Sequence, residues 1–559
     1  MSFSHFGTPQ SLREDYAILS HYGASSVEVQ DQQQIEILPD PPRGIPIHGR
    51  GAACTAAGIP PVSERTPLLQ PPPPIPWPRE PTDVDVLDAV FAEQTPTSNI
   101  FCEELRILTT YSLPIFGTQL FDYSFIVASV VSIGHISTVA LAAATLASMT
   151  ASVTGYSIVQ GFASTLDTLL PPAWTSDRPH MVGLWTQRMG FSMRSRCPQP
   201  IIAIWLNAEP ILLALNQEPE VARLAAIYLR WASLGLPAYT FNCISRRYFQ
   251  SQGLFDVPTR ITLVIAPINA FLNWLFVYPL GLSFPGAPFA TALSFNLVSA
   301  AFIVYGYYYA TPAAWSPITR ESFNLVTGEM WKGWGLLARL SIAGVGQLAS
   351  EWWCWELIGR EMGPVVLAAQ SVLLLSSSTT YQAPFALSVA TSVRIGNLLG
   401  EGNARRAGVV AATSIVMSVA LGCVFSILFL VFRHKWSYIF NSDPEVASLV
   451  ASIMPLVALF QVFDGTTSIS GGIFRARGKQ FAGAVLNLSA YYVIGIPLGL
   501  YLAFVHGHTL GGLWEGLTVA LVYSSFVGIW IALRGVDWEA EVVNAQGRIG
   551  GKEEGNARE

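Results

Sequence analysis

The chain begins with a polar, proline-rich segment and continues as a series of apolar runs separated by short polar stretches. From about residue 105 onward, the runs approach or exceed the ~20 residues that a helix needs to cross the hydrocarbon core of a bilayer. We predict twelve membrane-spanning helices, at residues 107–132, 136–166, 184–212, 222–248, 258–282, 287–310, 334–359, 364–392, 408–432, 446–473, 481–505 and 511–533. The pattern therefore indicates an all-α membrane protein.

The third apolar run contains two arginines, Arg194 and Arg196, together with two prolines. An arginine near the centre of a membrane helix costs about 2.5–3.5 kcal/mol on the insertion scale. Either these side chains reach toward the membrane surface or a wet cavity, or this stretch is an error in the predicted sequence. Both explanations stay open at this point.

The apolar region repeats itself with an offset near 220 residues. "FQSQG" at 249–253 matches "FRARG" at 474–478, each after the fourth span of its half, and Tyr156 matches Tyr381. Because six spans is an even number, the two halves share one orientation in the membrane. Parallel repeats of this kind are typical of secondary transporters, in which the substrate binds between the halves. We therefore predict two parallel six-helix repeats around a central cavity.

These patterns divide the chain into five parts. Residues 1–98 are predicted to be a disordered tail, because proline-rich sequence with little apolar periodicity cannot bury enough surface to offset its ordering entropy. Residues 99–310 form an N-lobe with helices 1–6, and residues 334–535 form a C-lobe with helices 7–12. A linker at 311–333 joins the lobes, and residues 536–559 form a C-terminal tail.

The basic residues predict the orientation of the chain. With twelve spans and an inside start, most of them fall on the inner side, namely Arg178, Arg188, Arg246, Arg247, Arg260, Arg320, Lys332, Arg394, Arg405, Arg406, Arg475, Arg477 and Lys479. Fewer fall on the outer side, namely Arg223, Arg360, Arg433 and Lys435. Because cytosolic loops carry the excess of Lys and Arg, both termini and the linker are expected in the cytosol.

Composition supports a membrane protein and gives no sign of an enzyme. The chain is 51% hydrophobic and only 12% charged, about half the charge of a typical soluble protein. Its six cysteines show no CxxC spacing, so we predict neither a disulfide framework nor a metal site. We find no nucleophile–base pair and no phosphate-binding loop, and accordingly predict no catalytic residue, no cofactor and no nucleic-acid partner.

Two acidic residues fall inside apolar spans at similar depth. Glu351 lies twelve residues after Arg339, or about 18 Å along the seventh helix. Asp464 lies eleven residues before Arg475, or about 16 Å from the same face on the tenth helix. An ionisable group at the midplane is costly, and burial favours its protonated form. The two carboxylates are therefore predicted to bind and release coupling ions; the alternative is a pair of satisfied structural acids.

Other polar residues in the spans are weaker candidates. Glu356 lies five residues after Glu351, and Arg360 follows one turn later, so a helix-end ion pair explains Glu356 as well as a coupling role does. Asp122 and Gln119 are one turn apart on the first span, where they predict either a polar patch of the cavity or a helix-packing contact.

Aromatic and amide side chains on the seventh and eighth spans complete the predicted cavity. Trp352 has an indole ring on which a cation can stack, although tryptophans in membrane helices more often serve packing. On the eighth span, we assign Gln370 and Tyr381 to the cavity lining.

Several longer motifs resemble the multidrug and toxic compound extrusion (MATE) family of the eukaryotic, fungal-like type. They are "GHISTVALAAATLASMTASVTGYSIVQG", "EWWCWE", "VRIGNLLGEGN" and "GGIFRARGKQFAGAVLNLSAYYVIGIPLGL". The resemblance covers about residues 105 to 535. It implies cation-coupled antiport of organic cations and other toxic solutes out of the cytosol, with the seventh-helix acidic motif at Glu351 and Glu356 and the tenth-helix acid at Asp464.

The chain departs from the family pattern in two places. A glutamate that animal members carry in the eighth span corresponds to Leu375, which puts animal-type drug selectivity in doubt. The polar turn after the second span reads "LDTLLPPAWTS", in which Pro171 and Pro172 replace the glutamine-containing form of the family.

Together these features predict a secondary antiporter that exports organic cations in exchange for protons, with alternating access between the lobes. Protons would neutralise Glu351 and Asp464 so that the bound cation leaves. Sodium remains an alternative coupling ion, since carboxylates serve either. A flippase for lipid-linked sugars shares the twelve-helix plan but would need a basic cavity. A membrane-bound enzyme or receptor is the alternative of another class.

The N-terminal tail contains a candidate sorting signal. In "ERTPLLQ", Glu64 precedes Leu68 and Leu69 at the spacing of an acidic dileucine motif, which trafficking adaptors read on cytosolic tails. This favours the vacuolar membrane slightly over the plasma membrane, with lipid and a possible adaptor as further partners.

Overall fold

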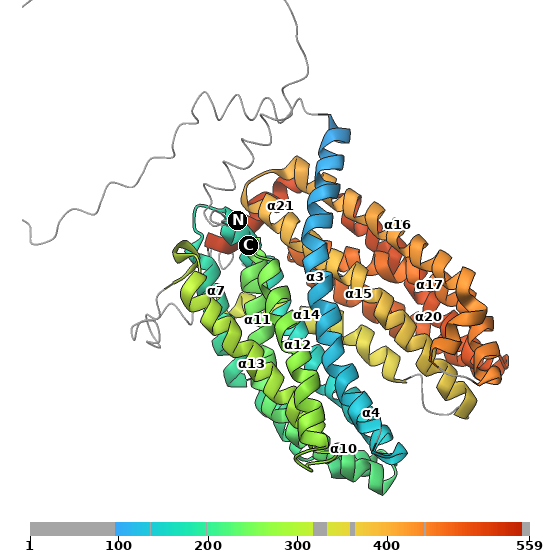
Figure 1. The fold of residues 1–559 in the computed structure, drawn as a ribbon. Coiled ribbons are helices and arrows are strands. Elements are labelled where there is room, and N and C mark those ends of the chain that lie inside the picture. Colours follow the sequence, from blue (N-terminus) through green and yellow to red (C-terminus); the bar gives the residue numbers. More distant parts are fainter. Residues whose placement is uncertain are drawn as a thin grey trace, which may run out of the picture. The chain divides into compact units, whose positions relative to one another are not determined.

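The computed structural model describes residues 96–134, 136–196, 198–316, 333–357, 364–440 and 443–550. Within these residues, the regular secondary structure is helical throughout (Figure 1). Eight helical stretches are long and apolar enough to cross a membrane. The other predicted spans, the third, fourth, seventh and eighth, correspond to helices described below, and the all-α membrane fold is confirmed. The candidate sorting signal lies outside the described residues, as do Arg360 and most of the linker.

The N-lobe contains the helices that follow from residue 97 to residue 309. They are α3 (Thr97–Gly134), α4 (Thr138–Ala151), the π-helix η1 (Ser152–Tyr156), α5 (Ser157–Ala163), α6 (Leu166–Thr175), α7 (His180–Arg196), α8 (Pro198–Leu206), α9 (Ala208–Ala214), α10 (Pro219–Ala232), the 3₁₀ turn η2 (Ser233–Gly235), α11 (Leu236–Ser251), α12 (Asp256–Val277) and α13 (Gly286–Tyr309).

The C-lobe repeats this plan with longer uninterrupted helices. Its helices are α14 (Trp334–Leu357), α15 (Pro364–Gly400), α16 (Ala404–Trp436), α17 (Pro444–Ala476), α18 (Gln480–Leu488), the π-helix η7 (Ser489–Gly495), α19 (Ile496–Leu500), the π-helix η8 (Tyr501–Val505) and α20 (Thr509–Leu533). A further helix, α21 (Trp538–Gly550), follows in the segment predicted as the C-terminal tail.

The predicted third span, at 184–212, corresponds to α7, α8 and α9. A turn at Asn207 separates α8 from α9, so the described part of this span is not one continuous helix. Arg194 is exposed on α7, whereas the side chain of Arg196 lies outside the described part.

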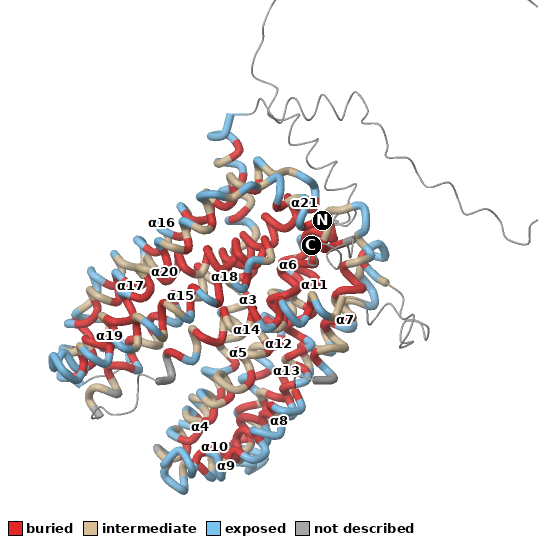
Figure 2. The backbone as a smooth tube through the Cα atoms, turned by 180° about the vertical axis from the view of Figure 1, so that it is seen from behind, coloured by how far each residue is buried: buried red, intermediate tan, exposed pale blue. Residues whose placement is uncertain are grey.

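Packing follows the sequence repeat. In the N-lobe, α12 packs on α3, and in the C-lobe the corresponding α18 packs on α14. The lobes meet through α14 against α5 and through α15 against α3, so the first helix of each lobe contacts the second span of the other. Most residues of α6 and α17 are buried, and Figure 2 shows buried residues along both helices.

Two glycines allow the lobes to approach closely. A Cβ atom on Gly344 of α14 would lie 2.5 Å from the carbonyl oxygen of Gly161 on α5, and one on Gly161 would lie 2.5 Å from Val345 Cα. Beside this crossing, the hydroxyls of Thr165 and Ser341 are hydrogen-bonded at 3.1 Å. The contact between α5 and α14 therefore depends on backbone packing against backbone.

Helix α21 lies against both lobes, in contact with α6 and with α15 and α16. Its Glu541 accepts from Arg477 Nη2 at 2.9 Å, and both side chains are buried. The Arg477 guanidinium also lies 5.7 Å from the ring centroid of Trp538. The α21 segment of the predicted tail is thus part of the helical body.

Candidate functional site

Helix α14 positions Glu351 inside the C-lobe. The helix is apolar on most of its length, with Cys354 fully buried and Glu351 partly buried. The hydroxyl of Tyr381, on α15, lies within hydrogen-bonding reach of the Glu351 carboxyl. The fold therefore brings Tyr381 of the eighth predicted span next to Glu351 of the seventh.

Asp464 reaches the same region from α17. Its side chain is only 6% exposed, and most of the neighbouring residues on α17 are buried as well. Its charge interacts with that of Glu351, and the ring of Tyr491 on η7 lies near both carboxyls. The structure thus brings together the two acids that helix spacing placed at equal depth.

This arrangement can bind either a proton or a cation. Two neighbouring carboxylates in a poorly solvated region repel each other when both are ionised. A proton or a bound organic cation relieves that repulsion, and each excludes the other because both neutralise the same charge. Within the described residues, no group of three or more His, Cys, Asp or Glu side chains has the arrangement of a metal site.

The other C-lobe candidates differ from this pair in their surroundings. Trp352 is partly buried on α14. Gln370 is buried on α15, and its Oε1 accepts from Trp514 Nε1 at 2.9 Å, which ties this amide oxygen to packing within the C-lobe. Glu356 lies on α14, and its side chain is outside the described part of the chain.

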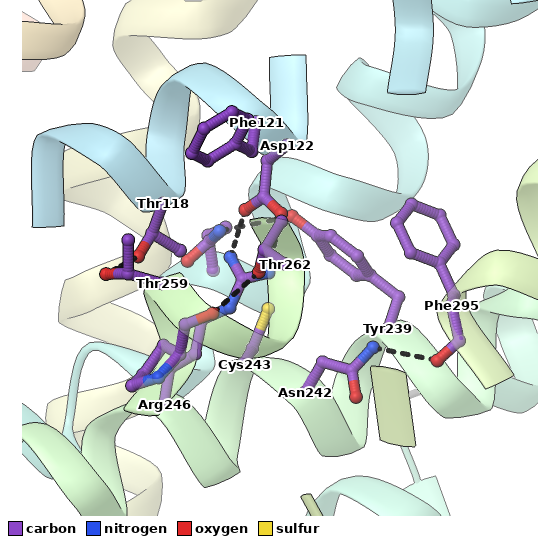
Figure 3. A network of polar contacts seen from close by, with 12 residues as sticks. Thr118, Phe121, Asp122, Tyr239, Asn242, Cys243, Arg246, Thr259, Thr262 and Phe295 are labelled. Atoms are coloured by element: carbon purple, nitrogen blue, oxygen red, sulfur yellow. Dashed lines mark hydrogen bonds and ion pairs between the residues drawn. The ribbon is translucent and has the colours of Figure 1, made fainter. Parts of the chain in front are cut away.

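In the N-lobe, Asp122 is not a free acid. Its two carboxylate oxygens accept from Nη1 and Nη2 of Arg246 on α11, the Nη2 contact being 2.8 Å (Figure 3). Gln119 lies one turn away on α3 and is partly buried. A bidentate pair neutralises the Asp122 charge, so it differs in kind from the C-lobe acids.

Sequence reasoning missed a charge cluster that joins the lobes. Asp167 of α6 lies 3.1 Å from Arg247 Nε and 3.3 Å from Arg475 Nε. The sequence predicts Arg246, Arg247 and Arg475 on the inner side as markers of orientation, yet all three lie on helices and form ion pairs that are partly or fully buried. The sequence feature that could have revealed this cluster is Asp167 itself, the one charged residue in the stretch "TLDTLLPP".

A second missed cluster lies between α3 and the C-lobe. Glu104 is fully buried and accepts from Arg394 Nη2 at 2.7 Å and from Nε of Arg406. Arg394 and Arg406 belong to the region "VRIGNLLGEGNARR", and the two arginines themselves serve in the sequence analysis only as markers of orientation. Two adjacent glutamates, Glu103 and Glu104, before the first predicted span give no indication of partners about 290 residues away.

Comparison with known proteins decides the family. A family model described as MatE matches residues 114–275 and 345–501, which together exceed half of the chain. The chain belongs to the MATE family. An uncharacterized transporter of Schizosaccharomyces pombe is 37% identical over 80% of this chain and 83% of its own length. Multidrug and toxin extrusion protein 2 of Mus musculus is 34% identical over 80% of this chain and 77% of its own length.

Solved structures of MATE transporters share the fold. The eukaryotic MATE transporter AtDTX14 has 27% sequence identity and a TM-score of 0.75, covering 80% of this chain and 100% of that chain. The Vibrio cholerae MATE transporter VcmN in its bent form has 16% identity and a TM-score of 0.66, covering 80% of this chain and 99% of that chain. This MATE protein is therefore a multi-pass integral membrane transporter and not an enzyme.

Proposed function

We propose that this MATE protein is a secondary antiporter that exports organic cations or other toxic solutes from the cytosol in exchange for protons. The observation that carries the proposal is the pair formed by Glu351 and Asp464, two acids from different helices whose charges act on each other. The multidrug and toxin extrusion proteins among its relatives support the substrate class. Both termini are assigned to the cytosol, and the protein to the vacuolar or plasma membrane.

The residues act in a cycle. With access from the acidic side, a proton binds the Glu351–Asp464 pair and displaces the cation. After the lobes reorient, the proton leaves toward the more alkaline cytosol, and the restored charge attracts a new cation. A ligand shifts a two-state equilibrium only through its different affinity for the two states, so competition at one charged site is sufficient for coupling. We assign Tyr381 and Trp352 to the lining of the cavity. Asp122 is paired with Arg246 and takes no part in proton exchange.

Uptake of a fluorescent organic cation into reconstituted vesicles tests this proposal. Vesicles with an acidic interior should accumulate the cation, and Glu351→Gln should abolish the pH-driven uptake while the protein remains in the membrane. Glu445→Gln is the matched control, because Glu445 is an exposed acid in the first turn of α17. Uptake by Glu351→Gln equal to wild type, or uptake driven only by a sodium gradient, would refute proton coupling at this pair.

A further inference from the structure

Asp167, Arg247 and Arg475, here called the Asp167 cluster, form a buried contact between the two lobes. Asp167 and Arg247 belong to the N-lobe and Arg475 to the C-lobe, and their side chains are 5%, 11% and 5% exposed. Each Asp167 oxygen faces one arginine, Oδ1 toward Arg247 and Oδ2 toward Arg475. Separation of the lobes at this point therefore requires the ion pair between Asp167 and Arg475 to break.

Hydrogen bonds between the lobes surround the cluster. The hydroxyl of Thr168 donates to the carbonyl oxygen of Arg475 at 2.5 Å, and Gln480 Nε2 donates to Thr168 Oγ1 at 3.0 Å. The hydroxyl of Thr175 donates to the carbonyl oxygen of Asn397 at 2.7 Å. The cluster thus lies within a continuous contact of α6 with α15, α17 and α18.

The charges of the cluster do not balance. Two guanidinium groups share one carboxylate, which leaves one positive charge in excess, and the charges of Arg247 and Arg475 repel each other. A buried charge without a counter-charge is strongly destabilising. Neighbouring Arg246 is already paired with Asp122, and Arg477 with Glu541, so neither of those acids is free to serve the cluster.

Arg475 is also directed toward the candidate site. Its Nη2 donates to Ser388 Oγ at 3.0 Å, on the same helix as Tyr381 and about two turns further on. A Cβ atom on Gly471 would lie 3.6 Å from Arg475 Nη1 and 2.8 Å from Nε2 of Gln347, which precedes Glu351 by one turn of α14. The Arg475 charge interacts with both Glu351 and Asp167.

Among the residues that the structure describes, the remaining groups around Glu351 supply no other cation. Asp464, Tyr381, Tyr491 and Cys354 interact with it from α17, α15, η7 and α14 itself. The segments η1, α5 and α18, which also pack against α14, contain no charged residue. Around Arg475, the interacting groups are Asp167 of α6, Arg247 of α11, and Tyr381 and Glu351. Glu351 is therefore the acid of the candidate site on which Arg475 acts.

We propose that the ionised Glu351 carboxylate is the second counter-charge of the Asp167 cluster, so that its neutralisation loosens the contact between the lobes. This inference rests on the proposed proton exchange and assigns the contact to the cytosolic side. A proton arriving from the outer side removes the negative charge near Arg475. The two arginines are then left with one carboxylate, and their repulsion favours separation of the lobes toward the cytosol. Loss of the proton to the cytosol restores the balance and closes the contact.

Distance measurements between spin labels test the inference. Labels at His180→Cys on α7 and Lys479→Cys before α18, both exposed positions, report on the two lobes beside the cluster. The full chain is held in lipid nanodiscs, and the other exposed cysteines, such as Cys102 and Cys423, are replaced by serine. Lowering the pH should raise the ratio of long to short distances at least about tenfold. Glu351→Gln should give the long distance already at neutral pH.

Removal of either arginine should abolish this response. In Arg475→Gln or Arg247→Gln, one cation faces one carboxylate, so the short distance should persist at low pH. Arg394→Gln is the matched control, because it disturbs the Glu104 contact between the lobes without touching the Asp167 cluster. That variant should retain the pH response.

Two results would overturn the inference: a short distance in Glu351→Gln at neutral pH, or an unchanged pH response in the arginine variants. Failure of the proposed function gives a different result, namely no cation uptake by the wild type under a pH gradient, whatever the label distances.

Discussion

At the scale of single residues, the partner of a buried carboxylate determines its role. Asp122 accepts two hydrogen bonds from one arginine, whereas Asp167 is shared between two arginines from different lobes. The charges of Glu351 and Asp464 act on each other, and neither carboxylate is in an ion pair that the structure describes. Of these acids, Glu351 and Asp464 are therefore the two to which we assign exchange of a proton for a substrate.

Replacement of Asp122 tests this distinction. Asp122→Asn leaves Arg246 without its counter-charge in a largely buried position and should destabilise the protein by about 3 kcal/mol. The double variant Asp122→Asn with Arg246→Gln should recover most of that loss, because both charges are gone. The thermal unfolding midpoint in detergent measures the effect, and the double variant should still show pH-driven uptake.

A stable Asp122→Asn variant that has lost pH-driven uptake would contradict this assignment. Asp122 would then be a coupling acid like Glu351, and its pairing with Arg246 would be one state of the transport cycle.

The sequence identified Glu351 and Asp464 because the rise of a helix converts residue spacing into depth. It did not identify the partner of Asp122, because Arg246 lies 124 residues away and local spacing contains no information about such a contact. Counting arginines by side likewise predicted their position along the membrane normal but not their burial. Arg475 and Arg394 were therefore assigned a topological role, when they also form contacts between the lobes.

At the scale of helices, the crossing of α14 and α5 sets how closely the lobes approach. Gly344 and Gly161 place the two backbones in direct contact. The sequence predicted both helices, since hydropathy averages over some twenty residues. The same averaging hid the turn at Asn207 between α8 and α9 and the π-helices η1 and η7, which depend on a few local residues.

Substitution at this crossing should open it. Gly344→Leu places a side chain where the carbonyl of Gly161 and the hydroxyl of Ser164 already lie, and should destabilise this conformer by about 1–3 kcal/mol. The labels on α7 and before α18 should then show the long distance at neutral pH. Gly335→Leu on the same helix is the control, because a Cβ atom there meets open space. Equal distances in the two variants would show that the crossing does not limit closure.

At the scale of the whole transporter, the repeat in the sequence predicted the two lobes, and the match to MATE structures bears out that architecture. The contacts that hold the lobes together in this conformer were not predictable, because they join residues such as Glu104 and Arg394 that are 290 positions apart. An internal repeat predicts the structure that the two halves have in common. It does not predict contacts between positions of the two halves that do not correspond to each other in the repeat.

The central claim is that a proton and a transported cation compete for Glu351 and Asp464. Proton release from the purified protein in weakly buffered detergent solution measures that competition without a gradient or a membrane. Addition of an organic cation near neutral pH should release protons in proportion to the cation bound, and the double variant Glu351→Gln with Asp464→Asn should release none. Cation binding by the wild type without proton release, or equal release by the double variant, would contradict the account.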